Sequence, residues 1–154
     1  RTLPATTALV IRDHIDLADL GDWYSGARAE LAAVSRDPDV RTTGPRGGLW
    51  STELFVDERG EAALFQPVAA TDEHRRSTGR LRLETLPPVD LAVAVHRGSD
   101  DLIGHTYGAL GAYVAEHELG VAGPIRETYV TEPTGGSEDV VTLGNPTLAV
   151  RSTM

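Results

Sequence analysis

Apolar residues recur along the chain in two patterns, one typical of buried strands and one typical of helices. Unbroken apolar runs occupy residues 8–11 and 91–95, as expected for strands that are covered on both faces. After each run and a polar turn, apolar residues recur at steps of three and four, which predicts a helix with one apolar face. The two stripes are Leu20, Trp23, Ala27, Leu31 and Val34, then Ile103, Tyr107, Leu110 and Val114.

Each predicted helix is followed by an aromatic-bearing segment that favours a strand, at residues 49–56 and 125–130. Turn residues at 57–60 and 133–137 indicate hairpins to a third strand in each half. The predicted unit is therefore strand–helix–strand–strand, present twice. Residues 79–84 alternate between polar and apolar, and we expect them to open the second half as an additional edge strand.

Several residues mark these two halves as an internal repeat. Leu3-Pro4 and Tyr24 recur 83 positions later as Leu86-Pro87 and Tyr107, and Gly44-Pro45 and Pro67 recur 79 positions later as Gly123-Pro124 and Pro146. Two similar offsets, each shared by two independent markers, predict a duplication. We expect an α+β fold made of duplicated βαββ modules, in one domain over residues 1–154. The repeats would cover about 1–70 and 79–150, with a linker at about 71–78.

The charge of the chain argues against nucleic acid as a direct partner. Fourteen basic residues, all arginine, face 23 acidic residues, for a net charge of −9. Such a surface repels phosphate backbones and favours cations. The one tight basic group is Arg75, Arg76, Arg80 and Arg82, which we interpret as a solvated linker.

The composition also narrows the cofactors and the location. The chain has no cysteine, and its five histidines lack metal-ligand spacing, so we expect neither a metal nor another cofactor. No apolar run is long enough to cross a bilayer and no signal peptide is visible, which predicts a cytoplasmic protein without a membrane partner. Because the first residue is Arg1, we expect the chain to be part of a longer protein.

Glu127 is the main candidate for a ligand contact. Strand alternation places Glu127 and Tyr129 on one face, and the repeat aligns them with Gly48 and Trp50. An aromatic residue in both halves with an acid in only one predicts a cleft with walls from both halves. In an apolar cleft the carboxylate would favour an organic cation, and aromatic faces would add cation–π attraction. The alternative is that Glu127 points to solvent beside an exposed Tyr129.

Three further aromatic residues are open to two interpretations. Tyr24 and Tyr107, near the starts of the two helices, could cover the ends of the cleft or fill the core with their hydroxyls reaching solvent. Trp23 lies on the apolar stripe of the first helix, which favours a core position.

The second half resembles the GyrI-like effector-binding family, which forms the C-terminal domain of many MerR-type and some AraC-type transcriptional regulators. The resemblance rests on the leucine–proline opening, His96-Arg97-Gly98 after the strand, Gly123-Pro124, the segment Arg126-Glu127-Thr128-Tyr129, and the end segment at residues 142–146. It implies a mostly antiparallel curved sheet with two main helices and a central groove, in which Glu127 meets cationic multidrug-type ligands. Ser99 and Trp50 depart from the family pattern.

The resemblance also implies partners and leaves alternatives. We expect a small-molecule ligand, DNA contact only through a fused domain, and a homodimer in the full-length regulator. Some relatives hydrolyse cyclopropane-containing electrophiles, and Glu127 could activate a water for that reaction. A third reading is a stand-alone inhibitor or binding protein.

Overall fold

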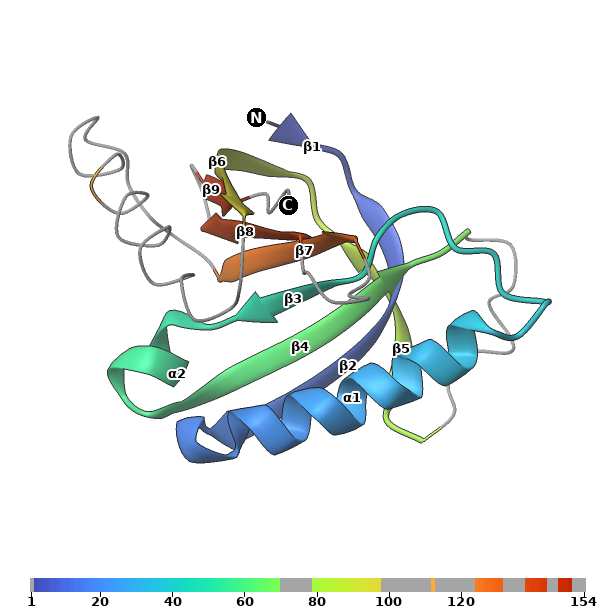
Figure 1. Ribbon diagram of the computed structural model, residues 1–154, viewed down its shortest axis with the longest axis horizontal. Coiled ribbons are helices and arrows are strands. Elements are labelled where there is room, and N and C mark those ends of the chain that lie inside the picture. The colour runs from blue at the N-terminus through green and yellow to red at the C-terminus, as the bar shows by residue number, and fades with distance from the viewer. Residues whose placement is uncertain are drawn as a thin grey trace. The chain divides into compact units, whose positions relative to one another are not determined.

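The computed structural model describes residues 2–69, 79–97, 112, 124–131, 138–143 and 147–150 (Figure 1). The chain divides into two compact units, one comprising Ala5–Pro87 and the other Arg1–Pro4 with Pro88–Met154. Both contain β-sheet, and the first carries a long helix, so the predicted α+β class is confirmed. No helix in the described part of the chain is long and apolar enough to span a membrane.

The unit Ala5–Pro87 is built on a four-stranded antiparallel sheet in the order β3-β4-β2-β5. Its strands are β2 (Thr6–Asp16), β3 (Gly47–Trp50), β4 (Arg59–Pro67) and β5 (Leu81–Leu86). A short 3-10 helix, η1 (Leu17–Asp19), leads from β2 into α1 (Leu20–Ser35), and α2 (Thr52–Val56) lies between β3 and β4.

Helix α1 confirms the predicted apolar stripe. It packs along β4 and β2, and Figure 1 shows it running beside these strands. Its fully buried residues are Ala27 and Leu31, one turn apart on the same face, while Trp23 is partly exposed. Because one of the two buried residues is an alanine, apolar burial alone anchors this helix only modestly.

The sheet of this unit is buried on both faces, as its apolar run predicts. Leu9 and Ile11 point to one face of β2, whereas Ala8 and Val10 point to the other, and all four are at most 1% exposed. Ala8 and Val10 belong to a core cluster with Phe65. Strand β2 continues well beyond this run, because its polar residues up to Asp16 still pair with β4.

The predicted strand over residues 49–56 is wrong in its second half. Strand β3 ends at Trp50, and the chain then turns into the single-turn helix α2. Leu54 of α2 is fully buried, and Gly60 of β4 leaves room for the helix backbone beside it. Tertiary packing therefore overrides the strand preference of residues such as Phe55 and Val56.

The expectation that residues 79–84 open the second half is also wrong. They contribute to β5, which pairs antiparallel with β2 and lies in the unit Ala5–Pro87. The pairing places Leu81 opposite Ile11 and Leu83 opposite Leu9, so the alternation does reflect a strand. A period of two identifies a strand but not its partner, which explains the error.

The other unit contains β1 (Thr2–Leu3), β6 (Val89–Arg97), β7 (Ile125–Thr131), β8 (Glu138–Leu143) and β9 (Thr147–Val150). Strand β6 pairs antiparallel with β1 and β8 and parallel with β9, and β8 pairs antiparallel with β7 and β9. The strands predicted at 91–95 and 125–130 are thus confirmed. The second predicted helix lies outside the described residues except for Ala112, which is helical.

Candidate functional site

Glu127 and Tyr129 lie together on one face of β7, as the alternation of this strand predicts. The Tyr129 hydroxyl donates a hydrogen bond of 2.8 Å to Oε2 of Glu127. Both residues are partly exposed, and the phenol restricts the orientation of the carboxylate. This pair combines a negative charge with an aromatic face, the two features that an aromatic cation requires.

The opposite face of β7 carries a buried arginine. Arg126 is 8% exposed, and burial lowers its pKa from the ordinary value because desolvation disfavours the charged form. Alternation along the strand separates this guanidinium from the face of Glu127. The sequence shows that alternation, but nothing in it signals that Arg126 is the buried member.

In the unit Ala5–Pro87, three aromatic rings form a cluster between α1 and β3. Trp23 packs edge-on against Trp50, with ring centroids 6.1 Å apart and an angle of 80° between the planes. Tyr24 lies at a tilt on the same ring, at 6.4 Å. Trp50 is 4% exposed, whereas Trp23 and Tyr24 are partly exposed. We call these three residues the aromatic cluster.

The strand register explains how the cluster fits on the sheet. Asp13 of β2 is paired with Ala62 of β4, and Ala62 is paired with Trp50 of β3, so the three form one row across the sheet. Trp23 reaches both ends of the row, with an indole N–H to Asp13 and a ring edge against Trp50. The small side chain of Ala62 leaves space for the indole between them.

Positive charge lies close to this cluster. Burial lowers the pKa of Arg46, the neighbouring charge of Arg28 lowers it further, and Tyr24 acts in the opposite direction. Like charges disfavour each other at short range, so the charge of Arg28 makes the charged form of Arg46 less favourable. A carboxylate such as Glu127 supplies the attraction that a cation requires.

The predicted site residues thus fall into two described pairs. Glu127 contacts Tyr129 in one unit, and Tyr24 contacts Trp50 in the other. Tyr107 lies outside the described residues. Within the described ranges, no group of three histidine, cysteine or acidic side chains is arranged to hold a metal ion.

Comparisons with known proteins identify the fold. No protein-family model matches the chain, and no curated protein matches it. The C-terminal domain of EcmrR superposes with a TM-score of 0.73 at 14% identity, over 96% of this chain and 94% of that domain. In the cryo-EM structure of an EcmrR–DNA complex, the match has a TM-score of 0.73 at 13% identity and covers 96% of this chain but 55% of EcmrR.

A third structure contains a ligand. SAV2435 bound to tetraphenylphosphonium matches with a TM-score of 0.61 at 11% identity, over 94% of this chain and 89% of that one. At these identities the likeness shows the fold alone. The chain therefore has the fold of the EcmrR C-terminal domain and of SAV2435, in line with the fold that the resemblance predicts.

Proposed function

We propose that this chain is a small-molecule effector-binding domain of a transcriptional regulator, and that it binds aromatic organic cations through Glu127. The observation that carries the proposal is the contact between Glu127 and Tyr129, a partly exposed carboxylate held by a phenol on one strand face. Support comes from the fold shared with the EcmrR C-terminal domain and with SAV2435, which was determined with a lipophilic aromatic cation.

The chemistry of the pair suits such a ligand. A carboxylate that loses water when a ligand covers it needs a compensating positive charge. The phenyl groups of tetraphenylphosphonium surround its charge with a large apolar surface, so removing this cation from water costs little electrostatic hydration free energy. An aromatic face beside the carboxylate contributes about 0.5–2 kcal/mol of cation–π attraction. The net charge of −9 further raises the local concentration of cations.

The proposal retains the predicted aromatic residues of each unit as candidate ligand contacts. Tyr129 in one unit and Tyr24 in the other are partly exposed, and Trp50, at 4% exposure, supports the Tyr24 ring. Tyr107 is included from the repeat alone. The proposal also includes what the repeat predicts: a single domain over residues 1–154 that is built of duplicated βαββ modules.

A fused DNA-binding domain and a dimeric regulator are further parts of the proposal. The chain matches about half of the EcmrR chain that is bound to DNA, which supports a division between a ligand-binding part and a DNA-binding part. The net negative charge of the present chain is consistent with leaving DNA contacts to another domain.

Calorimetry with a charged ligand and a neutral analogue tests the proposal. Tetraphenylphosphonium and triphenylphosphine oxide both present phenyl groups, but only the first carries a net charge. Glu127→Gln removes the charge while preserving the shape of the side chain. We expect it to weaken tetraphenylphosphonium binding about tenfold or more, which corresponds to about 1.4 kcal/mol, because the coulombic attraction between the carboxylate and the cation is lost. The oxide carries no net charge, so we expect its binding to be nearly unaffected.

Glu53→Gln is the matched control. Glu53 is an exposed acid on α2, so its replacement changes the net charge by the same amount. We expect it to change affinity less than twofold, because exposed charges are screened at physiological salt, roughly 0.15 M. Equal losses for Glu127→Gln and Glu53→Gln, or equal losses for both compounds, would show that Glu127 does not contact the cation.

A further inference from the structure

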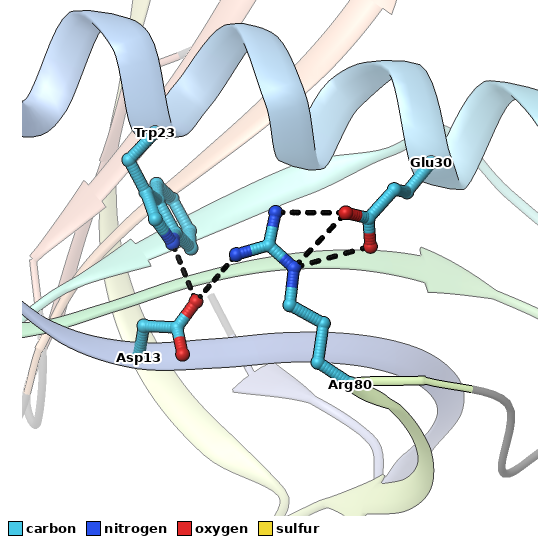
Figure 2. A network of polar contacts seen from close by, with 4 residues as sticks. All are labelled: Asp13, Trp23, Glu30 and Arg80. Carbon is cyan, nitrogen blue, oxygen red and sulfur yellow. Dashed lines mark hydrogen bonds and ion pairs between the residues drawn. The ribbon is translucent and has the colours of Figure 1, made fainter.

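Asp13 of β2 forms hydrogen bonds with Trp23 of the aromatic cluster and with Arg80. Oδ2 of Asp13 accepts a 2.6 Å hydrogen bond from the Trp23 indole N–H and a 2.8 Å bond from Nη1 of Arg80. Figure 2 shows both donors converging on this oxygen, with Asp13 on β2, Trp23 on α1 and Arg80 at the start of β5. Asp13 is therefore bonded to two segments that lie far apart in the sequence.

Arg80 joins the same group to a second point on α1. Its Nε lies 3.1 Å from both oxygens of Glu30, and its Nη2 lies 2.9 Å from Oε1. Glu30 follows Trp23 by seven residues, which is two helical turns on the same face. The hydrogen bond to Glu30 is the main reason why the pKa of Arg80 lies above its ordinary value, so the guanidinium stays charged.

The position of Asp13 in the sheet is unusual for an acid. It shares a face of β2 with Leu9, Ile11 and Ile15, all of them buried. A carboxylate in such a row loses hydration, which costs free energy unless it is paired. An apolar residue at this position would bury α1 equally well, but it could not accept a bond from the indole. An acid at position 13 is therefore explained by the orientation of the Trp23 indole rather than by packing.

We propose that Asp13 is a positioning residue for the aromatic cluster, which serves as a ligand wall. Asp13 fixes the Trp23 indole edge-on against Trp50, and Arg80 fixes Asp13. The partly buried Asp13 carboxylate accepts a bond from the indole N–H in this ring orientation, so removing Asp13 allows the ring to turn toward solvent. Trp23 would then no longer hold Trp50 in the T-shaped contact, and Trp50 supports Tyr24. The inference rests on the proposed function, because the wall matters only if a ligand binds there.

The two tryptophans provide a direct readout of the ring geometry. Trp23 and Trp50 are the only tryptophans in the sequence, so an exciton couplet in the far-ultraviolet circular dichroism reports on this pair alone. The Trp23→Phe variant keeps one tryptophan and therefore provides the reference spectrum without a couplet. Tetraphenylphosphonium affinity, measured by calorimetry on the 154-residue chain, is the second readout.

Three variants separate positioning from general stability. We expect Asp13→Ala to abolish the couplet and weaken tetraphenylphosphonium binding about tenfold, because the partly buried indole N–H loses its acceptor. Asp13→Asn retains an acceptor for the indole, and we expect it to restore the couplet and most of the affinity. Arg80→Gln leaves the Asp13–Trp23 bond in place but removes the ion pair that fixes Asp13. We therefore expect a weaker couplet and an affinity loss of about threefold.

Arg12→Gln is the control for lost ion pairs. Arg12 neighbours Asp13 but points to the opposite face of β2, where it pairs with Glu61 and Glu84. We expect it to leave both the couplet and the affinity unchanged. A couplet that survives Asp13→Ala, or one that is lost without any change in affinity, would overturn the inference. If Asp13→Ala does not fold, wild-type values for both readouts in Arg80→Gln, or loss of the couplet in Asp13→Asn, would still contradict the inference.

Failure of the proposed function would give a different result. If the unmodified chain does not bind tetraphenylphosphonium, the ligand-binding proposal fails and the role of Asp13 in a ligand wall fails with it. Loss of the couplet in Asp13→Ala would then show only that Asp13 orients Trp23. If the unmodified chain binds and Asp13→Ala binds equally well, the positioning role alone is wrong.

Discussion

The Tyr129 hydroxyl donates a hydrogen bond to Oε2 of Glu127, two positions earlier on β7, with 2.8 Å between the two oxygens. Adjacent side chains on one face of a strand are well placed for such a contact, since residues two apart point in the same direction. The hydrogen bond limits the rotation of the carboxylate and keeps the phenol ring at its side. A ligand that meets Glu127 therefore also meets Tyr129.

The first prediction separates the hydroxyl of Tyr129 from its ring. Tyr129→Phe retains the aromatic face and the charge of Glu127 but loses the hydrogen bond. We expect tetraphenylphosphonium to bind about threefold more weakly, in line with about 0.5–1.5 kcal/mol for one hydrogen bond. Calorimetry of Tyr129→Phe beside Glu127→Gln measures the difference. A loss as large as that of Glu127→Gln would mean that the phenol hydroxyl, rather than the charge, determines binding.

The second prediction concerns the close approach of α2 to β4 at Gly60. A Cβ atom on Gly60 would lie 2.4 Å from Oγ of Ser51 and 2.6 Å from the backbone nitrogen of Leu54. Because a backbone atom cannot rotate away, we expect Gly60→Ala to lower the free energy of unfolding by about 2–3 kcal/mol. Urea denaturation measures this.

Gly21→Ala is the control for Gly60→Ala. An added Cβ at Gly21, in the first turn of α1, would meet no atom within 4 Å. Alanine also has a higher helix propensity than glycine, so we expect a gain of up to about 1 kcal/mol. If both variants unfold at the same urea concentration, the steric account of Gly60 is incorrect.

The elements that could be predicted from the sequence are those in which the local pattern and the tertiary packing agree. Helix α1 follows its apolar stripe, and β7 follows the alternation that brings Glu127 to Tyr129. The end of β3 could not be predicted, because residues 52–56 have the composition of a strand. What makes them helical is the burial of Leu54 beside Gly60, a contact with a residue beyond the next turn.

The polar group around Asp13 was equally inaccessible to sequence reasoning. Arg80 belongs to the basic group that we interpreted as a solvated linker, yet it pairs with Asp13 and Glu30. These partners are separated from it by 67 and 50 positions, and no short-range pattern records such distances. A weak signal was present: Asp13 interrupts an apolar row of β2, which is costly unless a partner exists.

The third prediction concerns the salt dependence of an ion pair on β2. Arg12 forms ion pairs with Glu61 of β4 and with Glu84 of β5 and so bridges these two acids. Partial burial disfavours its charge, but the hydrogen bond to Glu61 and the charge of Glu84 outweigh this and raise the pKa of Arg12. All three side chains are at least 36% exposed, so solvent screens the pairs.

We therefore expect Arg12→Gln to cost about 1 kcal/mol or less at low ionic strength. In about 1 M sodium chloride the difference from the unmodified chain should largely disappear, because the Debye length falls to about 3 Å. Urea denaturation at both salt concentrations measures the change. A difference that persists undiminished in high salt would assign the stabilisation to packing of the arginine stem.

The last prediction concerns the space above Ala62. This residue is fully buried in the row between Asp13 and Trp50, and the Trp23 indole reaches both ends of that row. We expect Ala62→Val to overpack the site, to lower the free energy of unfolding by about 1–3 kcal/mol, and to displace the indole. Urea denaturation gives the stability, and the exciton couplet of the two tryptophans gives the ring geometry.

Ala62→Gly distinguishes the steric effect from destabilisation in general. Glycine weakens a strand interior, but it adds no atoms to the space that the indole occupies. We expect Ala62→Gly to retain the couplet despite a comparable loss of stability, whereas Ala62→Val loses it. Retention of the couplet in Ala62→Val would mean that the Trp23 ring does not lie across Ala62. Because both variants leave Asp13 and Arg80 unchanged, the comparison depends only on the room between the strands and α1.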